Sequence, residues 1–191
     1  MSEANNEITN TIKDAIKEFV TLNLPKEFKT VYWQTSRYEA PKKPFCLLTW
    51  LSDSEDLRSS EIQLPNSLTK EHREYKTAVI TIALNVDGLK TQQHNLKERE
   101  NLAQLNAENL RTLFQLTKTA YKFKKLFAVN STSGIRPLDE VSAGGYIFRR
   151  EFDLTIGYDK VYHYDLPVSH AVNIDLDKNN IHIQVTEDEI K

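Results

Sequence analysis

The chain contains few of the residues on which covalent and cofactor chemistry depends. Its single cysteine, Cys46, cannot form a disulfide within the chain. Cys46 lies in the apolar run FCLLTWL, where a free thiol is typical of a small buried core residue. Only 5 glycines occur, and the sequence has neither a glycine-rich phosphate-binding loop nor a G-x-S-x-G nucleophile turn. We therefore expect no cofactor and no nucleophilic enzyme site.

Charge of one sign and long apolar runs are also scarce. The formal net charge is -2, and no basic block is long enough to contact phosphates, so we expect no sequence-specific nucleic-acid binding. No apolar run approaches the roughly 20 residues of a membrane helix, and the first residues lack the basic and apolar parts of a signal peptide. Hydrophobic residues make up 39% of the chain, which suffices for one core. We expect a soluble protein of a reducing cytosol with one main domain.

Two segments have the three- and four-residue spacing of apolar residues that predicts amphipathic helices. The first helix is expected to begin near Asn5 or Asn6 and to end before Pro25. The second is expected from about Thr91 to Thr117. Its predicted apolar stripe consists of Leu102, Leu105, Leu110, Leu113, Phe114 and Leu116.

Strand patterns precede the second helix. The continuous apolar run from Phe45 to Leu51 predicts a strand that is buried on both faces. The alternation from Tyr75 to Val86 predicts another strand, and Asp87-Gly88 predicts a turn after it. The mostly polar segment 52–74 is expected to be a loop, interrupted by a short strand at Glu61–Leu64.

The clearest strand pattern lies within Ser133–Pro167, where a polar turn precedes a long alternating segment. Apolar side chains occupy the even positions of Tyr146–Tyr158 apart from Arg150, and the odd positions from Arg149 to Thr155 are polar or charged, with Ile147 as an exception. Such a strand has one face on a core and the other toward water or a partner. Arg149 and Arg150 therefore point to opposite faces, and Arg150 needs a specific ion pair on the apolar side.

The end of the sequence predicts a β-hairpin. Apolar residues alternate with polar ones over 172–177 and again over 181–185, and a turn at 178–180 separates the two runs. Together the patterns predict an α+β fold: an antiparallel or mixed sheet of four to five strands, two helices packed mainly on one face, and a C-terminal β-hairpin. We expect a main domain over residues 1–166 and a hairpin extension over 167–191.

Candidate metal ligands are sparse. The five histidines show no H-E-x-x-H spacing, and Asp175-x-Asp177-x-Asn179 lacks the glycine and glutamate that complete a calcium loop. Glu151 and Asp153 share one face of the predicted strand, and paired carboxylates bind catalytic metal ions in nucleases. Alternating charges on a solvated or inter-subunit face are commoner. A metal-dependent nuclease of a mobile element therefore stays open as one alternative.

Two segments resemble the neck or tail terminator proteins of long-tailed bacteriophages. The first is the turn GIRPLD at 134–139, which is followed by the strand YIFRREFDL at 146–154. The second is APKKPFCLLTW, in which Pro41, Pro44, Phe45 and Leu48 match the family's entry into a core strand. The resemblance covers roughly residues 6–165.

The resemblance implies a structural virion protein of the tail or neck, assembled in the host cytoplasm, with no enzyme activity. Terminator proteins of this kind form a ring, usually of six subunits, at the head-proximal end of the tail tube, where they end tail polymerisation and join the tail to the head. The implied partners are further copies of the chain, tail tube protein, head–tail connector or neck proteins and, as an open case, sheath protein.

A ring requires contact surfaces, and the charged face of the last long strand, the 52–74 loop and the terminal hairpin are expected to supply them. An alternative identity is another neck or head-completion connector protein, which would also assemble into a ring. The suspected interface residues are Arg136, Asp139, Arg149, Arg150, Glu151, Asp153, Tyr158 and Tyr162.

Overall fold

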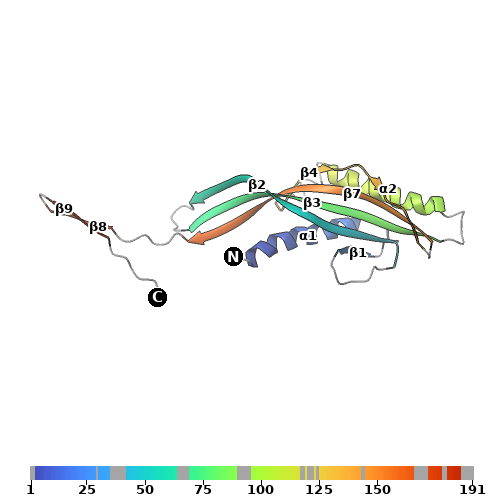
Figure 1. Ribbon diagram of the computed structural model, residues 1–191, viewed down its shortest axis with the longest axis horizontal. Helices are drawn as coiled ribbons and strands as arrows, with labels where there is room; N and C mark the ends of the chain where they lie inside the picture. The colour runs from blue at the N-terminus through green and yellow to red at the C-terminus, as the bar shows by residue number, and fades with distance from the viewer. Residues whose placement is uncertain are drawn as a thin grey trace. The chain divides into compact units, whose positions relative to one another are not determined.

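The computed structural model describes residues 3–28, 30–34, 42–63, 69–89, 96–116, 119, 123, 125–142, 145–165, 172–177 and 180–185 (Figure 1). Helices and strands are both present in this part of the chain, as predicted for an α+β protein. The elements are α1 (Glu3–Asn23), β1 (Thr30–Trp33), β2 (Phe45–Gln63), β3 (Thr69–Leu89), α2 (Leu96–Gln115), β4 (Ala128–Thr132), β5 (Arg136–Pro137), β6 (Glu140–Ser142), β7 (Gly145–Asp165), β8 (Val172–Asp177) and β9 (Asn180–Val185).

The main sheet is mixed and contains seven strands within the described residues. Five of them follow one another in the order β1-β2-β3-β7-β4, and β5 and β6 bring the sheet to more than the four to five strands predicted. β1 pairs parallel with β2, whereas β4, β5 and β6 each pair antiparallel with β7. The two additional strands, β5 and β6, come from the segment predicted as a polar turn. With two and three residues, they are too short to show an alternating pattern.

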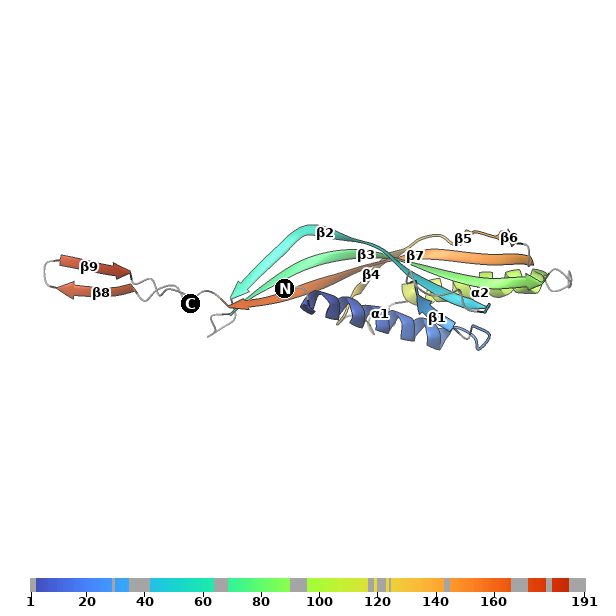
Figure 2. The same cartoon turned by 60° about the horizontal axis from the view of Figure 1, so that its bottom comes forward.

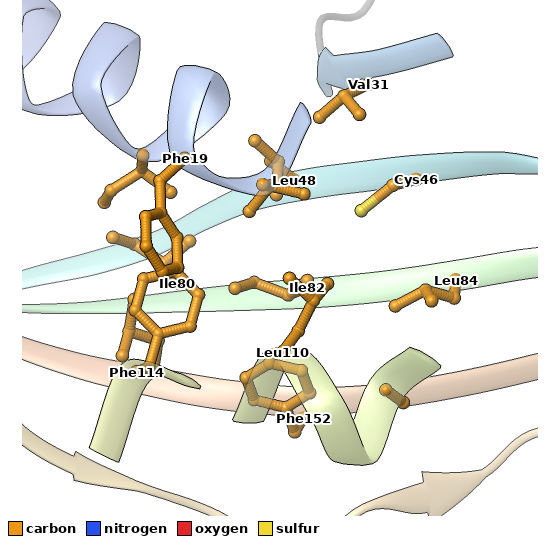
Figure 3. Close-up of a cluster of buried hydrophobic side chains, with 14 of the residues drawn as sticks. Phe19, Val31, Cys46, Leu48, Ile80, Ile82, Leu84, Leu110, Phe114 and Phe152 are labelled. Carbon is orange, nitrogen blue, oxygen red and sulfur yellow. The ribbon is translucent and has the colours of Figure 1, made fainter. Parts of the chain in front are cut away.

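Both helices cover the same face of this sheet, as predicted (Figure 2). A single core cluster joins buried residues of both helices to even-numbered residues of β2, β3 and β7. The Phe19 and Phe114 rings, 4.8 Å apart between centroids, connect the two helices above Ile80 and Ile82 (Figure 3). Each fully buried side chain of this size contributes about 1.5–3 kcal/mol, so this layer supplies most of the stability.

The apolar stripe of α2 differs from the prediction. Its buried residues are Ala103, Ala107, Leu110 and Phe114, whereas Leu105 is 56% exposed. The predicted stripe was wrong at Leu105 and Leu116 because it followed residue size. The helix instead turns its alanines inward, and their small side chains let its backbone approach the sheet. The predicted helical residues 91–95 lie outside the described part of the chain.

The predicted loop is wrong over residues 52–60 and 69–74, because β2 continues to Gln63 and β3 begins at Thr69. The short strand predicted at Glu61–Leu64 is confirmed over residues 61–63, which form the end of β2. These strand ends are polar on both faces, so the sequence shows no alternation there. The prediction that Phe45–Leu51 is buried on both faces is also wrong, since Leu51 is 58% exposed. Helices cover only the even-numbered face of β2, and Leu51 lies on the other face.

Asp87-Gly88 does not form the predicted turn, because both residues lie within β3. Gly88 is buried where strand and helix approach closely. A Cβ at this position would lie 2.8 Å from Leu96 Cδ2 and 2.9 Å from Phe148 Cε2. The glycine therefore permits close packing of β3 against its neighbours.

The chain divides into two compact units. Unit 1 comprises Met1–Ser59 and Glu74–Lys160, and it contains every buried hydrophobic residue found among the described side chains. Unit 2 comprises Ser60–Arg73 and Val161–Lys191 and includes the two-stranded sheet of β8 and β9. This antiparallel sheet confirms the predicted hairpin, although the turn residues 178 and 179 lie outside the described part. The predicted domain boundary near residue 166 stays a prediction.

Neither described helix is long and apolar enough to cross a membrane.

A second glycine is required on the helix-free face of the sheet. Gly157 of β7 pairs with Ala128 of β4, and the Tyr75 side chain from β3 lies over it. The Asn130 side-chain amide donates a hydrogen bond of 3.4 Å to the Tyr75 hydroxyl. Only a residue without a Cβ leaves room for this tyrosine to cross β7.

We expect Gly157→Ala to lower the free energy of unfolding by about 1–3 kcal/mol, the usual cost of overpacking. The added Cβ would lie 1.9 Å from Tyr75 Oη. Gly134→Ala is the matched control, because no atom lies within 4 Å of its added Cβ. Thermal unfolding followed by circular dichroism measures both, and equal melting temperatures for the two variants would contradict the packing role of Gly157.

Candidate functional site

Four of the suspected interface residues form one charged group on the helix-free face of the sheet. We define the β7 charge cluster as Arg136, Arg149, Glu151 and Asp153. The last three occupy alternate positions of β7 and so share a face. Arg136 of β5 pairs directly opposite Glu151, which places its guanidinium over the same face.

Each carboxylate of the cluster is held by arginine. Glu151 accepts hydrogen bonds from Arg136 Nη2 at 3.1 Å and from Arg149 Nη2 at 2.7 Å, one on each carboxylate oxygen. Asp153 accepts from Arg136 Nη1 at 2.6 Å and Nη2 at 2.9 Å. The Thr81 hydroxyl of β3 donates to Asp153 Oδ1 at 2.7 Å. Arg136 thus bridges both acids in a fork geometry that lysine cannot reproduce.

The cluster is layered, with its acids beneath its bases. The Glu151 side chain is 9% exposed, whereas those of Arg136 and Arg149 are 44% and 31% exposed. Hydrogen bonds from Arg136 hold the pKa of Asp153 below its ordinary value, and they raise the pKa of the Arg136 guanidinium. The surface therefore presents two permanently charged guanidinium groups with fixed positions.

The opposite face of β7 contains the ion pair predicted for Arg150. This residue is only 3% exposed, and its guanidinium contacts acids from two elements. Nη2 lies 2.9 Å from Glu100 Oε1 of α2, and Nη1 bonds to Asp139 Oδ1 between β5 and β6. Nε donates to Gln104 Oε1 at 3.0 Å. Arg150 thereby ties α2 and the β5–β6 connection to the centre of β7.

The remaining predicted interface residues lie elsewhere. Tyr158 is 2% exposed, and its ring packs 6.3 Å from the Trp50 ring inside the core of unit 1. The prediction that Tyr158 lies on a contact surface is therefore corrected. Its side chain has an even-numbered position in β7, and that face of the strand packs against the helices. Burial, together with the Asp53 carboxylate, raises the pKa of Tyr158 to about 12. Tyr162 lies in unit 2, where its half-buried ring is 6.0 Å from that of His72.

Sequence reasoning missed the residues that complete these two groups. Thr81, Glu100 and Gln104 are 72, 50 and 46 residues from their β7 partners, and no local pattern marks them. Ser133 was also missed. Its hydroxyl accepts a hydrogen bond of 2.8 Å from the Asp153 backbone N–H, and its own N–H donates to the Asp153 carbonyl at 2.9 Å. A serine beside a turn glycine was the only available signal.

The geometry favours a structural role for Glu151 and Asp153 over the metal-binding role of the nuclease alternative. Their oxygens already accept hydrogen bonds from arginine, and a metal ion would have to displace those guanidinium groups. Within the ranges that the structure describes, no group of three or more His, Cys, Asp or Glu side chains could hold a metal ion. The exposed guanidinium groups of this cluster have fixed positions and could bind acidic groups of a macromolecular partner.

Comparison with known proteins gives one match to a family. The family model is described as phage neck terminator protein and matches residues 10–187. This range is 178 of the 191 residues, and it includes the β7 charge cluster and the hairpin. The family resemblance predicted from the sequence segments is thus confirmed. The search of curated proteins found no match.

We expect Arg150→Ala to destabilise unit 1 by about 2–4 kcal/mol, because it removes a buried stem and leaves the acids on α2 and the β5–β6 connection unpaired. Arg150→Met keeps most of the stem, so its cost should be smaller. Chemical unfolding measures both variants. Combining Arg150→Met with Asp139→Asn should cost less than the sum of the single changes, and strict additivity would show that the pair is not coupled.

Acid stability should depend on Asp153. A carboxyl group whose pKa is lowered in the folded state stabilises the protein at pH values above the ordinary pKa of the group, which is 3.8 for Asp153. This stabilisation is lost as the pH falls below 3.8 and the carboxylate becomes protonated in the folded protein. Asp153→Asn should therefore be less stable than the natural protein at neutral pH, and the difference should shrink on acidification below that value. Melting temperatures measured across this range test the prediction. A difference that stays constant with pH would contradict it.

Proposed function

The chain belongs to the family of phage neck terminator proteins, and on this premise we propose that its copies close into a ring at the head-proximal end of the tail tube. The ring would contain six subunits, end polymerisation of the tube and join the tail to the head connector. The family places the protein among the structural components of the tail and neck of the virion. The observation that carries the finer proposal is the β7 charge cluster.

The sheet of unit 1 has two chemically different faces, which suits such a ring. Head-to-tail contacts that close a ring join two different surfaces of neighbouring subunits. One face of the sheet is covered by α1 and α2, and the other carries the β7 charge cluster. A subunit with unlike faces can meet a copy of itself on one side and a different protein on another.

The exposed arginines of the cluster are the contact residues that we propose. Arginine is enriched at interface centres because its planar group forms several directed hydrogen bonds and stacks on aromatic rings. In this protein Glu151 and Asp153 already hold Arg136 and Arg149 in place. Binding would then cost little side-chain entropy, and the network would favour a partner that offers carboxylates or carbonyl oxygens.

The proposed partners are further copies of this chain, tail tube protein and the head–tail connector or neck proteins. In a contractile tail the sheath protein would be a further partner. A connector protein from another level of the neck would also form a ring, but it would bind a different partner protein. Binding to purified tail tube protein therefore separates the terminator role from a connector role.

We expect the purified protein, alone or with tail tube protein, to show a mass near six chains by light scattering after size exclusion. Adding it to polymerising tail tube protein should shorten the tubes seen by electron microscopy. A single-chain mass in both samples, or tubes of unchanged length, would contradict the proposed role.

The arginine contacts have their own variants. Replacing both Arg136 and Arg149 by Lys keeps positive charge beside the buried Glu151 but removes the planar fork of donors, and it should weaken ring formation or tube binding about tenfold or more, equivalent to at least about 1.4 kcal/mol. Lys97→Gln, which removes an exposed charge on α2, is the matched control and should behave like the natural protein. Thermal unfolding confirms that each variant is folded. If the double variant assembled normally, the cluster would be a structural network without a contact role.

A further inference from the structure

The side chains of unit 2 whose exposure the structure describes belong to residues 60–62, 70–73 and 161–163. None of these is a buried hydrophobic side chain, and Ile62 and Val161 are about half exposed. Its described contacts include pairs of partly exposed polar groups, such as Lys70 with Glu61 at 3.7 Å and His163 with Glu71 at 3.4 Å. Exposed ion pairs contribute about 0–1 kcal/mol each. These described pairs therefore contribute little to the stability of the unit.

The β8–β9 hairpin is a second part of unit 2 that favours an additional contact. It is a sheet of two strands, and its register sets Val172 opposite Val185, Ile174 opposite Ile183 and Leu176 opposite Ile181. Apolar residues thus occupy one set of paired positions. An isolated two-stranded hairpin is marginally stable in water. A surface that accepts its strand edge and its apolar positions would stabilise it.

β1 is an edge strand of the main sheet, and the sequence around it has a charge opposite to that of the hairpin segment. This strand ends the sheet order and, in the described residues, pairs only with β2, so its other side is a strand edge. Residues 24–44, which include β1, contain five basic and two acidic residues and carry a net charge of +3. Residues 171–191, which include the hairpin, contain two basic and five acidic residues and carry a net charge of -3. The two segments match in charge.

We propose that the β8–β9 hairpin of one copy of the chain adds to the β1 edge of a second copy. Backbone hydrogen bonds between the added strand and β1 would supply affinity, as in other cases of strand addition. The acidic residues of the hairpin would lie near the exposed lysines Lys26 and Lys42, which flank β1 in the sequence and determine which strand is accepted.

The occupant is a second copy because this chain carries both complementary parts. A hairpin that binds an edge at another place on the same molecule forms a head-to-tail contact, and such contacts repeat until a ring closes. The inference therefore rests on the proposed ring and identifies the contact that links its subunits. It leaves the β7 charge cluster available for the tail tube or connector.

Charge reversal on the two sides tests this contact in the full chain. Asp175→Lys with Asp177→Lys, and separately Lys26→Glu with Lys42→Glu, should each weaken association of the copies about tenfold or more. An equimolar mixture of the two double variants should associate, because each supplies the charge that the other lacks. Lys97→Glu with Glu108→Lys, which reverses two exposed charges on α2, is the matched control. The readout is mass by light scattering over a range of concentrations.

The possible outcomes separate this inference from the proposed function. If the natural protein and both double variants all form the ring, the hairpin contact is overturned and the proposed ring stands. A natural protein that stays a single chain, even with tail tube protein, would overturn the ring and this contact together. Melting curves show whether each variant is folded. Asp175→Asn with Asp177→Asn provides a milder second test, for which an intermediate loss is expected and an unchanged association would count against the contact.

Discussion

The helix-free face of the sheet depends on the ion pairs that the buried Glu151 carboxylate makes with Arg136 and Arg149. A buried carboxylate without partners would be strongly destabilising, so the two arginines must stay in place for β7 to remain in the centre of the sheet. The same strand carries Arg150 on its other face, where Glu100 and Asp139 neutralise it. Charge on both faces of one strand thus connects β5, β6 and α2 to the core.

In our proposal, unit 1 supplies stability and unit 2 supplies a contact between copies. Unit 1 contains the buried hydrophobic residues found in the described part of the chain, and it has what an independent fold requires. Unit 2 presents paired charges and a two-stranded hairpin. In the proposed ring, charged contact surfaces would let the subunits associate without a large exposed apolar patch, which would promote aggregation.

Sequence patterns predicted the helices, the long last strand and the hairpin, and they failed where the pattern was weak or misleading. The polar ends of β2 and β3 have no apolar face, so nothing in the local sequence distinguishes them from a loop. α2 turns Ala103 and Ala107 inward, and a stripe drawn through the leucines misses them. The Asp87-Gly88 pair is typical of a turn, but here Gly88 lies within β3 and lets Leu96 and Phe148 approach the strand.

Strand alternation alone establishes that Arg149 and Arg150 point to opposite faces, because side chains alternate along every strand. It also establishes that Arg150 needs an acidic partner, since an unpaired buried charge is too costly. That the partners are Glu100 and Asp139, and that Arg136 lies over Glu151, follows only from the folded arrangement of the chain. Those choices depend on the register of β5 against β7 and on the docking of α2. Register and docking result from packing of the whole core, which no short segment of the sequence contains.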